Sequence, residues 1–131
     1  MSLYLDASAL VKRYVEEPES VAVVEAMDGA DWVMSRIGYA ETARAIHVRE
    51  RSRMLEQFRR DWGFFEVVEV DEELCAHAAA LCRSDDLGTL DAIHLASALA
   101  VETDIVVATF DRRLHTAARR AGLETLPAAL A

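Results

Sequence analysis

The chain has 131 residues with a formal net charge of -9, which argues against a protein that holds nucleic acid by bulk charge attraction. Its length suits one domain over residues 1–131, and 53% hydrophobic residues with two prolines exclude a disordered chain. No apolar run approaches the roughly 20 residues of a membrane span, and no signal-like start is present, so we expect a cytoplasmic protein.

Short apolar runs rich in β-branched and aromatic residues alternate with segments of helical periodicity. In chain order the expected elements are strand 2–5, helices 8–17 and 19–28, strand 31–35, helices 37–53 and 54–62, strand 64–70, helices 71–84 and 89–102, strand 104–109, helix 111–122 and strand 124–126. This alternation favours an α/β fold with a mainly parallel sheet of about five short strands and helices on both faces.

The two cysteines, Cys75 and Cys82, lie seven residues apart on one helical pattern. This spacing places them about two turns apart on the same helix face. We expect buried, reduced thiols there, and neither a disulfide nor a metal site.

Thirteen of the 14 basic residues are arginine, the side chain best suited to forked phosphate contacts. They form two groups, Arg44, Arg49, Arg51, Arg53, Arg59 and Arg60 in the first and Arg112, Arg113, Arg119 and Arg120 in the second. Either group is equally consistent with a solvated helix face that balances acids and with a surface that contacts RNA.

Two aspartates stand between a predicted strand and a predicted helix. Asp6 directly follows the strand 2–5, and Asp111 lies just after the strand 104–109 and begins the helix 111–122. Each is explained locally as a helix N-cap, because a carboxylate accepts hydrogen bonds from free backbone amides. Ser8 competes with Asp6 for the capping role, and we expect Ser8 to be the better candidate for it.

Two further acids lie within predicted helices. Glu41 stands about one turn into its helix and can pair with Arg44 on the surface. Asp91 is harder to explain locally, because it lies in the first turn of a helix that is apolar on nearly every side, and a buried carboxylate needs a partner. His94, one turn later, can be that partner, although a core histidine bonded to backbone is the favoured interpretation.

We expect the four acids to lie close together, because parallel strands bring their carboxyl ends to one edge of the sheet. Carboxylates gathered there repel one another unless a cation neutralises them. Oxygen ligands of this kind suit Mg²⁺ or Mn²⁺, and no cluster with zinc spacing competes for the site.

Other classes of protein with acidic active sites fit this sequence less well. A phosphate-receiving response regulator needs a lysine at a late strand end, but the only lysine, Lys12, lies in the first helix. A haloacid-dehalogenase-like phosphatase needs a second aspartate two residues after the first, where Ser8 stands. Glycine-rich phosphate loops and a serine nucleophile elbow are absent from the sequence.

Four segments stand out in order along the chain, LYLDASALVKRYVEEP, YAETARA, TLDAIHLASAL and VVATFDRRLHTAARRAGL. Together they resemble the PIN-domain nucleases, and more closely the VapC toxins of VapBC toxin-antitoxin pairs. The resemblance implies a three-layer α/β/α sandwich, usually a homodimer, and an endoribonuclease restrained by a VapB-like antitoxin. It also implies one or two Mg²⁺ or Mn²⁺ ions held by Asp6, Glu41, Asp91 and Asp111.

In that family, small hydroxyl side chains at the positions of Ser8 and Thr109 support the acids. The position of Arg112 and Arg113 beside Asp111 suggests phosphate contacts with RNA. Two alternatives remain open, a non-catalytic PIN-like module that binds RNA or protein, and a stand-alone nuclease that processes RNA or acts on DNA.

Overall fold

The computed structural model describes residues 1–49, 52–101 and 104–130. Within these ranges, the strands form one sheet in the order β3-β2-β1-β4-β5, and every neighbouring pair is parallel. The strands are β1 (Ser2–Leu5), β2 (Asp31–Ser35), β3 (Glu66–Val68), β4 (Ile105–Ala108) and β5 (Glu124–Leu126). The predicted parallel sheet of about five short strands is confirmed.

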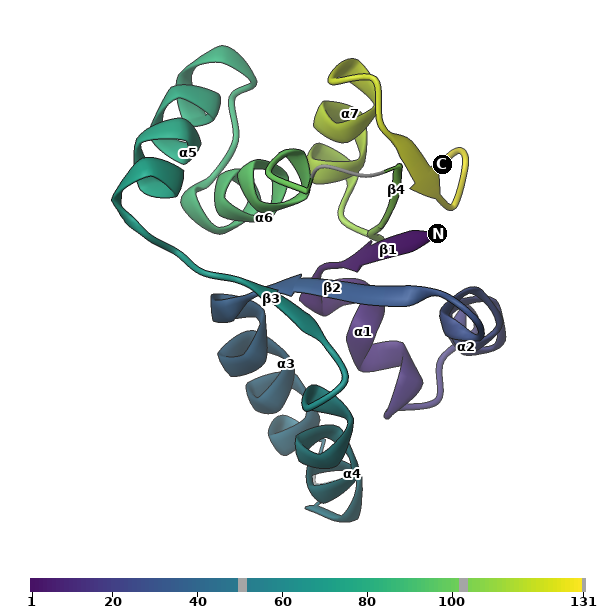
Figure 1. The fold of residues 1–131 in the computed structure, drawn as a ribbon. Coiled ribbons are helices and arrows are strands. Elements are labelled where there is room, and N and C mark those ends of the chain that lie inside the picture. The colour runs from purple at the N-terminus through teal and green to yellow at the C-terminus, as the bar shows by residue number, and fades with distance from the viewer. Residues whose placement is uncertain (50–51, 102–103, 131) are drawn as a thin grey trace.

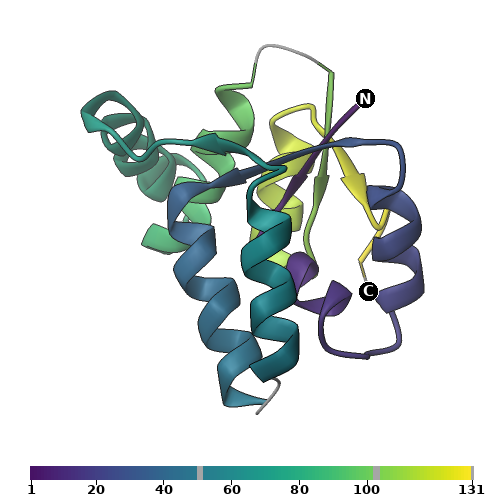
Figure 2. The ribbon, with the colours of Figure 1, turned by 60° about the horizontal axis from the view of Figure 1, so that its bottom comes forward.

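Helices cover both faces of this sheet (Figure 1). The first face carries α1 (Ala7–Leu10), the 3-10 helix η1 (Val11–Arg13), α2 (Ser20–Met27), α3 (Arg36–Val48) and α4 (Ser52–Trp62). The second face carries α5 (Glu72–Ser84), α6 (Thr89–Leu99) and α7 (Arg112–Arg120). Figure 2 shows α3 and α4 side by side. The predicted three-layer α/β/α sandwich is therefore confirmed.

The strand order follows from the handedness of the connections. The chain starts on the central strand β1, moves outward to β2 and β3, and then returns to the other side of β1 as β4 and β5. Right-handed crossovers in opposite directions place the helices of the two halves on opposite faces. The order reverses between β1 and β4, and such a reversal leaves a crevice beyond the carboxyl ends of the strands.

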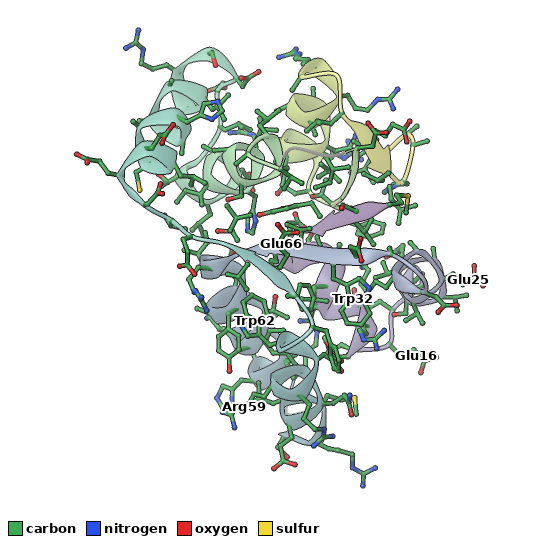
Figure 3. The ribbon with its side chains drawn as sticks, in the orientation of Figure 1. Glu16, Glu25, Trp32, Arg59, Trp62 and Glu66 are labelled. Atoms are coloured by element: carbon green, nitrogen blue, oxygen red, sulfur yellow. The ribbon has the colours of Figure 1, made fainter. Side chains whose placement is uncertain are left out.

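Two apolar cores lie on the two faces of the sheet, and β1 contributes to both because its side chains alternate. Leu3 and Leu5 enter the core beneath α1–α4, whereas Tyr4 enters the core beneath α5–α7. The first core holds aromatic side chains, among them Trp32 and Trp62, which Figure 3 shows on the same side of the sheet.

Several element ends differ from the prediction for tertiary reasons. The first helix ends at Arg13 and does not continue to residue 17. The Ser20 hydroxyl accepts the Glu17 N–H and donates to the Val15 carbonyl, so a turn replaces the last helical residues. The expected strand 64–70 shortens to β3, since Phe65 packs into the aromatic core.

Two helices also end earlier than predicted. The helix expected over 37–53 ends at Val48, and the helix expected over 89–102 ends at Leu99. The remainder of each prediction includes residues 50–51 and 102, which lie outside the described residues.

The expectation of buried cysteines is wrong. Both thiols are free, but Cys75 is exposed and Cys82 is half-buried. The buried face of α5 is formed by Leu74 and Ala78, so Cys75 lies on a different side of that helix. Among the described residues, no helix combines the length and the apolar character needed to cross a membrane.

Candidate functional site

Asp6 follows β1 directly and caps α1. Its Oδ1 accepts the Ala9 N–H at 2.9 Å and the Ser8 hydroxyl at 2.7 Å, and its Oδ2 accepts the Thr109 hydroxyl at 2.5 Å. The prediction that Ser8 caps this helix is wrong. Ser8 instead donates to Asp6 and accepts the Phe110 N–H at 2.9 Å, because it already lies inside the helix.

Burial dominates the electrostatics of Asp6, which is 4% exposed. Burial raises the pKa of the carboxyl above its ordinary value, while the nearby His94 and the hydrogen bonds from Thr109 and Ser8 act in the opposite direction. The three hydrogen bonds therefore hold one defined orientation of a carboxylate that has little access to water.

Asp111 occupies the equivalent position after β4. Its Oδ1 accepts the Leu114 N–H at 3.0 Å as the N-cap of α7. Its own N–H donates to the Thr109 hydroxyl oxygen at 3.1 Å, and the same hydroxyl donates to Asp6. Thr109 thus connects the two aspartates across the reversal in strand order.

Glu41 lies on α3, and its side chain is 26% exposed. Its Oε1 pairs with His94 Nε2 at 2.6 Å and not with Arg44 as the local interpretation expected. His94 also contacts the Tyr4 hydroxyl through Nδ1 at 2.7 Å. The favoured expectation for His94, a hydrogen bond to backbone, is therefore wrong, since its hydrogen-bond partners are Tyr4 and Glu41. With Asp91 it interacts electrostatically.

Asp91 lies half-buried in the first turn of α6. Within the described part of the chain, its carboxylate receives no hydrogen bond. Its pKa is raised to about 6, mainly by burial and then by the carboxylates of Asp111 and Asp6, with a smaller contribution from Glu41, whereas His94 opposes them. Asp91 thus interacts electrostatically with each of the other three acids, and the four candidate residues form one cluster.

The cluster is not a preassembled ligand cage. Among the described residues, no three Asp, Glu, His or Cys side chains are arranged so that they hold one metal ion. Asp6, Asp111 and Glu41 each bind a protein partner, and like charges favour their separation. The donor chemistry nevertheless fits a hard cation. Four carboxylates, one after β1, one on α3, one on α6 and one at the start of α7, concentrate negative charge at the carboxyl edge of the sheet.

Two members of the second arginine group, Arg112 and Arg113, lie beside this edge, next to Asp111. Arg112 and Arg113 are exposed at the start of α7 and line a surface hollow of about 280 Å³. Its other lining residues are Asp85, Asp86, Thr116, Ala117 and Arg120. Of the first group, Arg44 lies on α3 and Arg49 directly follows it, and Arg53, Arg59 and Arg60 lie on α4. Arg51 lies outside the described residues.

Tyr4 is a residue of the site that the sequence reasoning missed, and the contacts of His94 were misassigned. A signal was present for both, since each places a polar group in an otherwise aliphatic segment, SLYL for Tyr4 and TLDAIHLASAL for His94. A buried tyrosine hydroxyl or imidazole requires a partner, which predicts that the two belong to a polar network.

Comparisons with known proteins agree with this geometry. The PIN domain profile matches residues 3–120. The chain is 40% identical to Ribonuclease VapC45 of Mycobacterium tuberculosis over 139 residues, covering 98% of this chain and 96% of that protein.

Solved structures show the same fold. The structure of VapC20 from Mycobacterium tuberculosis, described as a Sarcin-Ricin loop cleaving toxin, matches with a TM-score of 0.75 at 17% identity, over 88% of this chain and 95% of that one. A toxin-antitoxin complex from Klebsiella pneumoniae matches with a TM-score of 0.67 at 19% identity, over 85% and 87%. Since a family profile spans most of the chain and a close relative spans nearly all of it, this chain belongs to the PIN domain family, among the relatives of the VapC proteins.

Proposed function

We propose that this protein is an endoribonuclease that requires Mg²⁺ or Mn²⁺. One or two ions would be held by the four carboxylates, Asp6, Glu41, Asp91 and Asp111. The observation that carries the proposal is their electrostatic convergence on Asp91 at the carboxyl edge of the sheet. RNA as the substrate is supported by the 40% identical relative, which is named a ribonuclease.

When bound, such ions supply positive charge to a scissile phosphate and acidify water for attack on phosphorus. The chain supplies the orientation of the ligands. The α1 and α7 amides and the Thr109 hydroxyl fix the carboxylates of Asp6 and Asp111. Helix N-termini also favour negative charge, so the fold directs these two acids before substrate arrives.

Arg112 and Arg113 are proposed to contact RNA phosphates. Both are exposed, and the hollow they line adjoins the start of α7, which Asp111 caps. An arginine fork matches two phosphate oxygens, so substitution by alanine should raise the half-saturating RNA concentration more than it lowers the maximal rate.

The proposed biological role is the toxin of a toxin-antitoxin pair, acting in the cytoplasm as a homodimer and inhibited by a VapB-like antitoxin. The fold shared with a toxin-antitoxin complex supports such a partner. Co-expression with the product of an adjacent small reading frame tests this role. A co-purifying complex that has lost RNA cleavage supports it, and cleavage unaffected by the bound partner contradicts it.

The experiment that tests the proposed activity compares wild type with Asp91→Asn in an RNA cleavage assay over a Mn²⁺ titration. Asp91 accepts no hydrogen bond from the described residues, so the amide removes charge with little cost to the fold. We expect cleavage to fall at least about 100-fold, because a charged ligand of the ion that acts on the reacting phosphate is lost. Asp6→Asn is less clean, since the Asp6 carboxylate also caps α1.

Asp104→Asn is the matched control, because it removes the same charge from an exposed position before β4, at the opposite edge of the sheet. We expect wild-type cleavage from it. Folded Asp91→Asn that cleaves like wild type would contradict the proposal. RNA binding without cleavage at any cation would instead favour a non-catalytic module, and metal-dependent cleavage without growth arrest on expression would favour a stand-alone nuclease.

A further inference from the structure

Glu41 lies at the end of a buried chain of hydrogen bonds that crosses the sheet. The Ser35 N–H donates to the Tyr4 hydroxyl oxygen at 3.2 Å, Tyr4 contacts His94 Nδ1 at 2.7 Å, and His94 Nε2 contacts Glu41 Oε1 at 2.6 Å. Tyr4 is 0% exposed and His94 is 2% exposed. Because α3 and α6 cover opposite faces of the sheet, this chain links the two helical layers (Figure 1).

The direction of these hydrogen bonds follows from the donors available. The Ser35 N–H can only donate, and burial raises the pKa of the Tyr4 phenol, so Tyr4 retains its proton. In a neutral His94 ring, that phenol proton bonds to Nδ1, and the ring hydrogen lies on Nε2. In a protonated ring both nitrogens donate. His94 Nε2–H therefore donates to the Glu41 carboxylate in either charge state.

Glu41 depends on such a donor more than the two capping aspartates do. Asp6 and Asp111 accept backbone N–H groups at helix starts, whereas Glu41 lies inside α3, where the backbone amides bond to carbonyls of the same helix. A glutamate also has more rotatable bonds than an aspartate. The bond from His94 engages Oε1 and so restricts the direction of the whole carboxylate.

We propose that His94 is a positioning residue for Glu41, and that Tyr4 fixes the imidazole in the orientation this requires. The inference rests on the proposed function, since it assigns Glu41 as a ligand of the divalent cation. A histidine with two polar partners also accounts for a buried polar side chain on the apolar helix α6, one turn after Asp91. Helix α6 would then contribute one acid directly and orient a second from the opposite layer.

Two amide substitutions of His94 separate positioning from packing. The Gln side chain in His94→Gln places its amide near the position of Nε2 and can donate to Glu41, whereas the shorter side chain in His94→Asn places its amide near Nδ1 and cannot reach. The measurement is Mn²⁺ affinity by calorimetry, with the fold checked by circular dichroism. We expect His94→Asn to weaken Mn²⁺ binding at least about tenfold, and His94→Gln to remain within about threefold of wild type.

His115→Leu is the matched control, because His115 is also a buried histidine but contacts the Pro127 carbonyl at 2.7 Å. It should lower the melting temperature and leave Mn²⁺ affinity unchanged. Equal affinity of folded His94→Asn and His94→Gln overturns the inference. If both variants fail to fold, nitrogen NMR of the wild-type His94 ring decides, since a hydrogen on Nε2 supports the assignment and a bare Nε2 overturns it.

The outcomes also separate this inference from the proposed function. Wild type that binds Mn²⁺ and cleaves RNA, with His94→Asn binding equally well, leaves the proposed function intact and overturns the role of His94. Wild type that binds no Mn²⁺ overturns both.

Discussion

At the scale of single residues, the Thr109 hydroxyl connects Asp6 and Asp111. It donates to Asp6 and accepts the Asp111 N–H, so one small side chain holds two acids from different strands. Because Thr109 is 0% exposed, water cannot replace either bond. Thr109→Val keeps the shape and leaves both partners unsatisfied, and we expect it to lower the unfolding free energy by about 1–3 kcal/mol.

Urea denaturation followed by circular dichroism measures this loss. Thr116→Val, an exposed position on α7, is the control and should stay within about 0.5 kcal/mol of wild type. Equal stability of Thr109→Val and Thr116→Val would contradict the bridging role of Thr109.

The burial of Asp91 and repulsion from its neighbouring carboxylates predict a stability gain from Asp91→Asn. The rise of its pKa from 3.8 to about 6 corresponds to roughly 3 kcal/mol for a fully buried group. Because Asp91 is only half-buried, solvent screening reduces the expected gain from Asp91→Asn to about 1 kcal/mol at pH 7.5 in EDTA.

The pH dependence of this gain has a defined sign. A raised pKa destabilises the folded state only while the carboxyl is ionised, so the advantage of Asp91→Asn is full above about pH 6 and shrinks as the pH falls toward 4. Thermal denaturation across this range measures it. A gain that grows on acidification would show that the cost of ionising the Asp91 carboxyl in the folded state is not its cause.

Individual residues were predictable to different degrees. The four acids could be selected from the sequence because each stands in a segment that resembles the family's motifs. The hydrogen-bond partners of these acids could not be predicted from the sequence. Whether Asp6 or Ser8 caps α1 depends on the Thr109 and Phe110 groups, which approach from β4 about 100 residues away. His94 reaches Glu41 from the opposite layer, a contact that helical spacing alone does not reveal.

At the scale of elements, Asp61 ties the 3-10 helix η1 to α4. This buried carboxylate accepts the Tyr14 hydroxyl at 2.6 Å, Arg13 Nε at 3.2 Å and Gln57 Nε2 at 2.9 Å. Burial and the bond to Asp61 both raise the pKa of Tyr14, which keeps the phenol a donor. Tyr14→Phe should therefore cost about 2 kcal/mol of unfolding free energy, the value expected for a hydrogen bond to a charged group.

Tyr39→Phe is the matched control, because Tyr39 belongs to the same aromatic core and makes no side-chain hydrogen bond with the described residues. It should change the unfolding free energy by less than about 0.5 kcal/mol in the same urea titration. Equal losses from the two variants would contradict the role of Asp61.

Element type was predictable from periodicity, whereas element ends depended on distant contacts. The run VVATFD identifies β4 and the start of α7 because β-branched residues precede an aspartate. The end of the first helix was not predictable, because it depends on the Ser20 hydroxyl and on the pairing of Lys12 with Glu17 and Glu19. These groups meet only once the turn has formed.

At the scale of the whole molecule, the reversal of strand order beside β1 gathers the acids. The alternation of strands and helices predicted a parallel sheet, but it did not specify which strands are neighbours. Registers place Leu5 beside Ala108, so Asp6 and Thr109 emerge at the same level. Part of the net charge of -9 is concentrated at this edge, because Asp6, Glu41, Asp91 and Asp111 all lie there.

The most direct test of the central claim is anomalous diffraction from crystals of the wild-type protein soaked in Mn²⁺. The proposed site predicts an anomalous peak bounded by the carboxylates of Asp6, Glu41, Asp91 and Asp111, and its loss in Asp91→Asn crystals soaked in the same way. Mn²⁺ bound elsewhere, with no peak among these four carboxylates, would contradict the assignment.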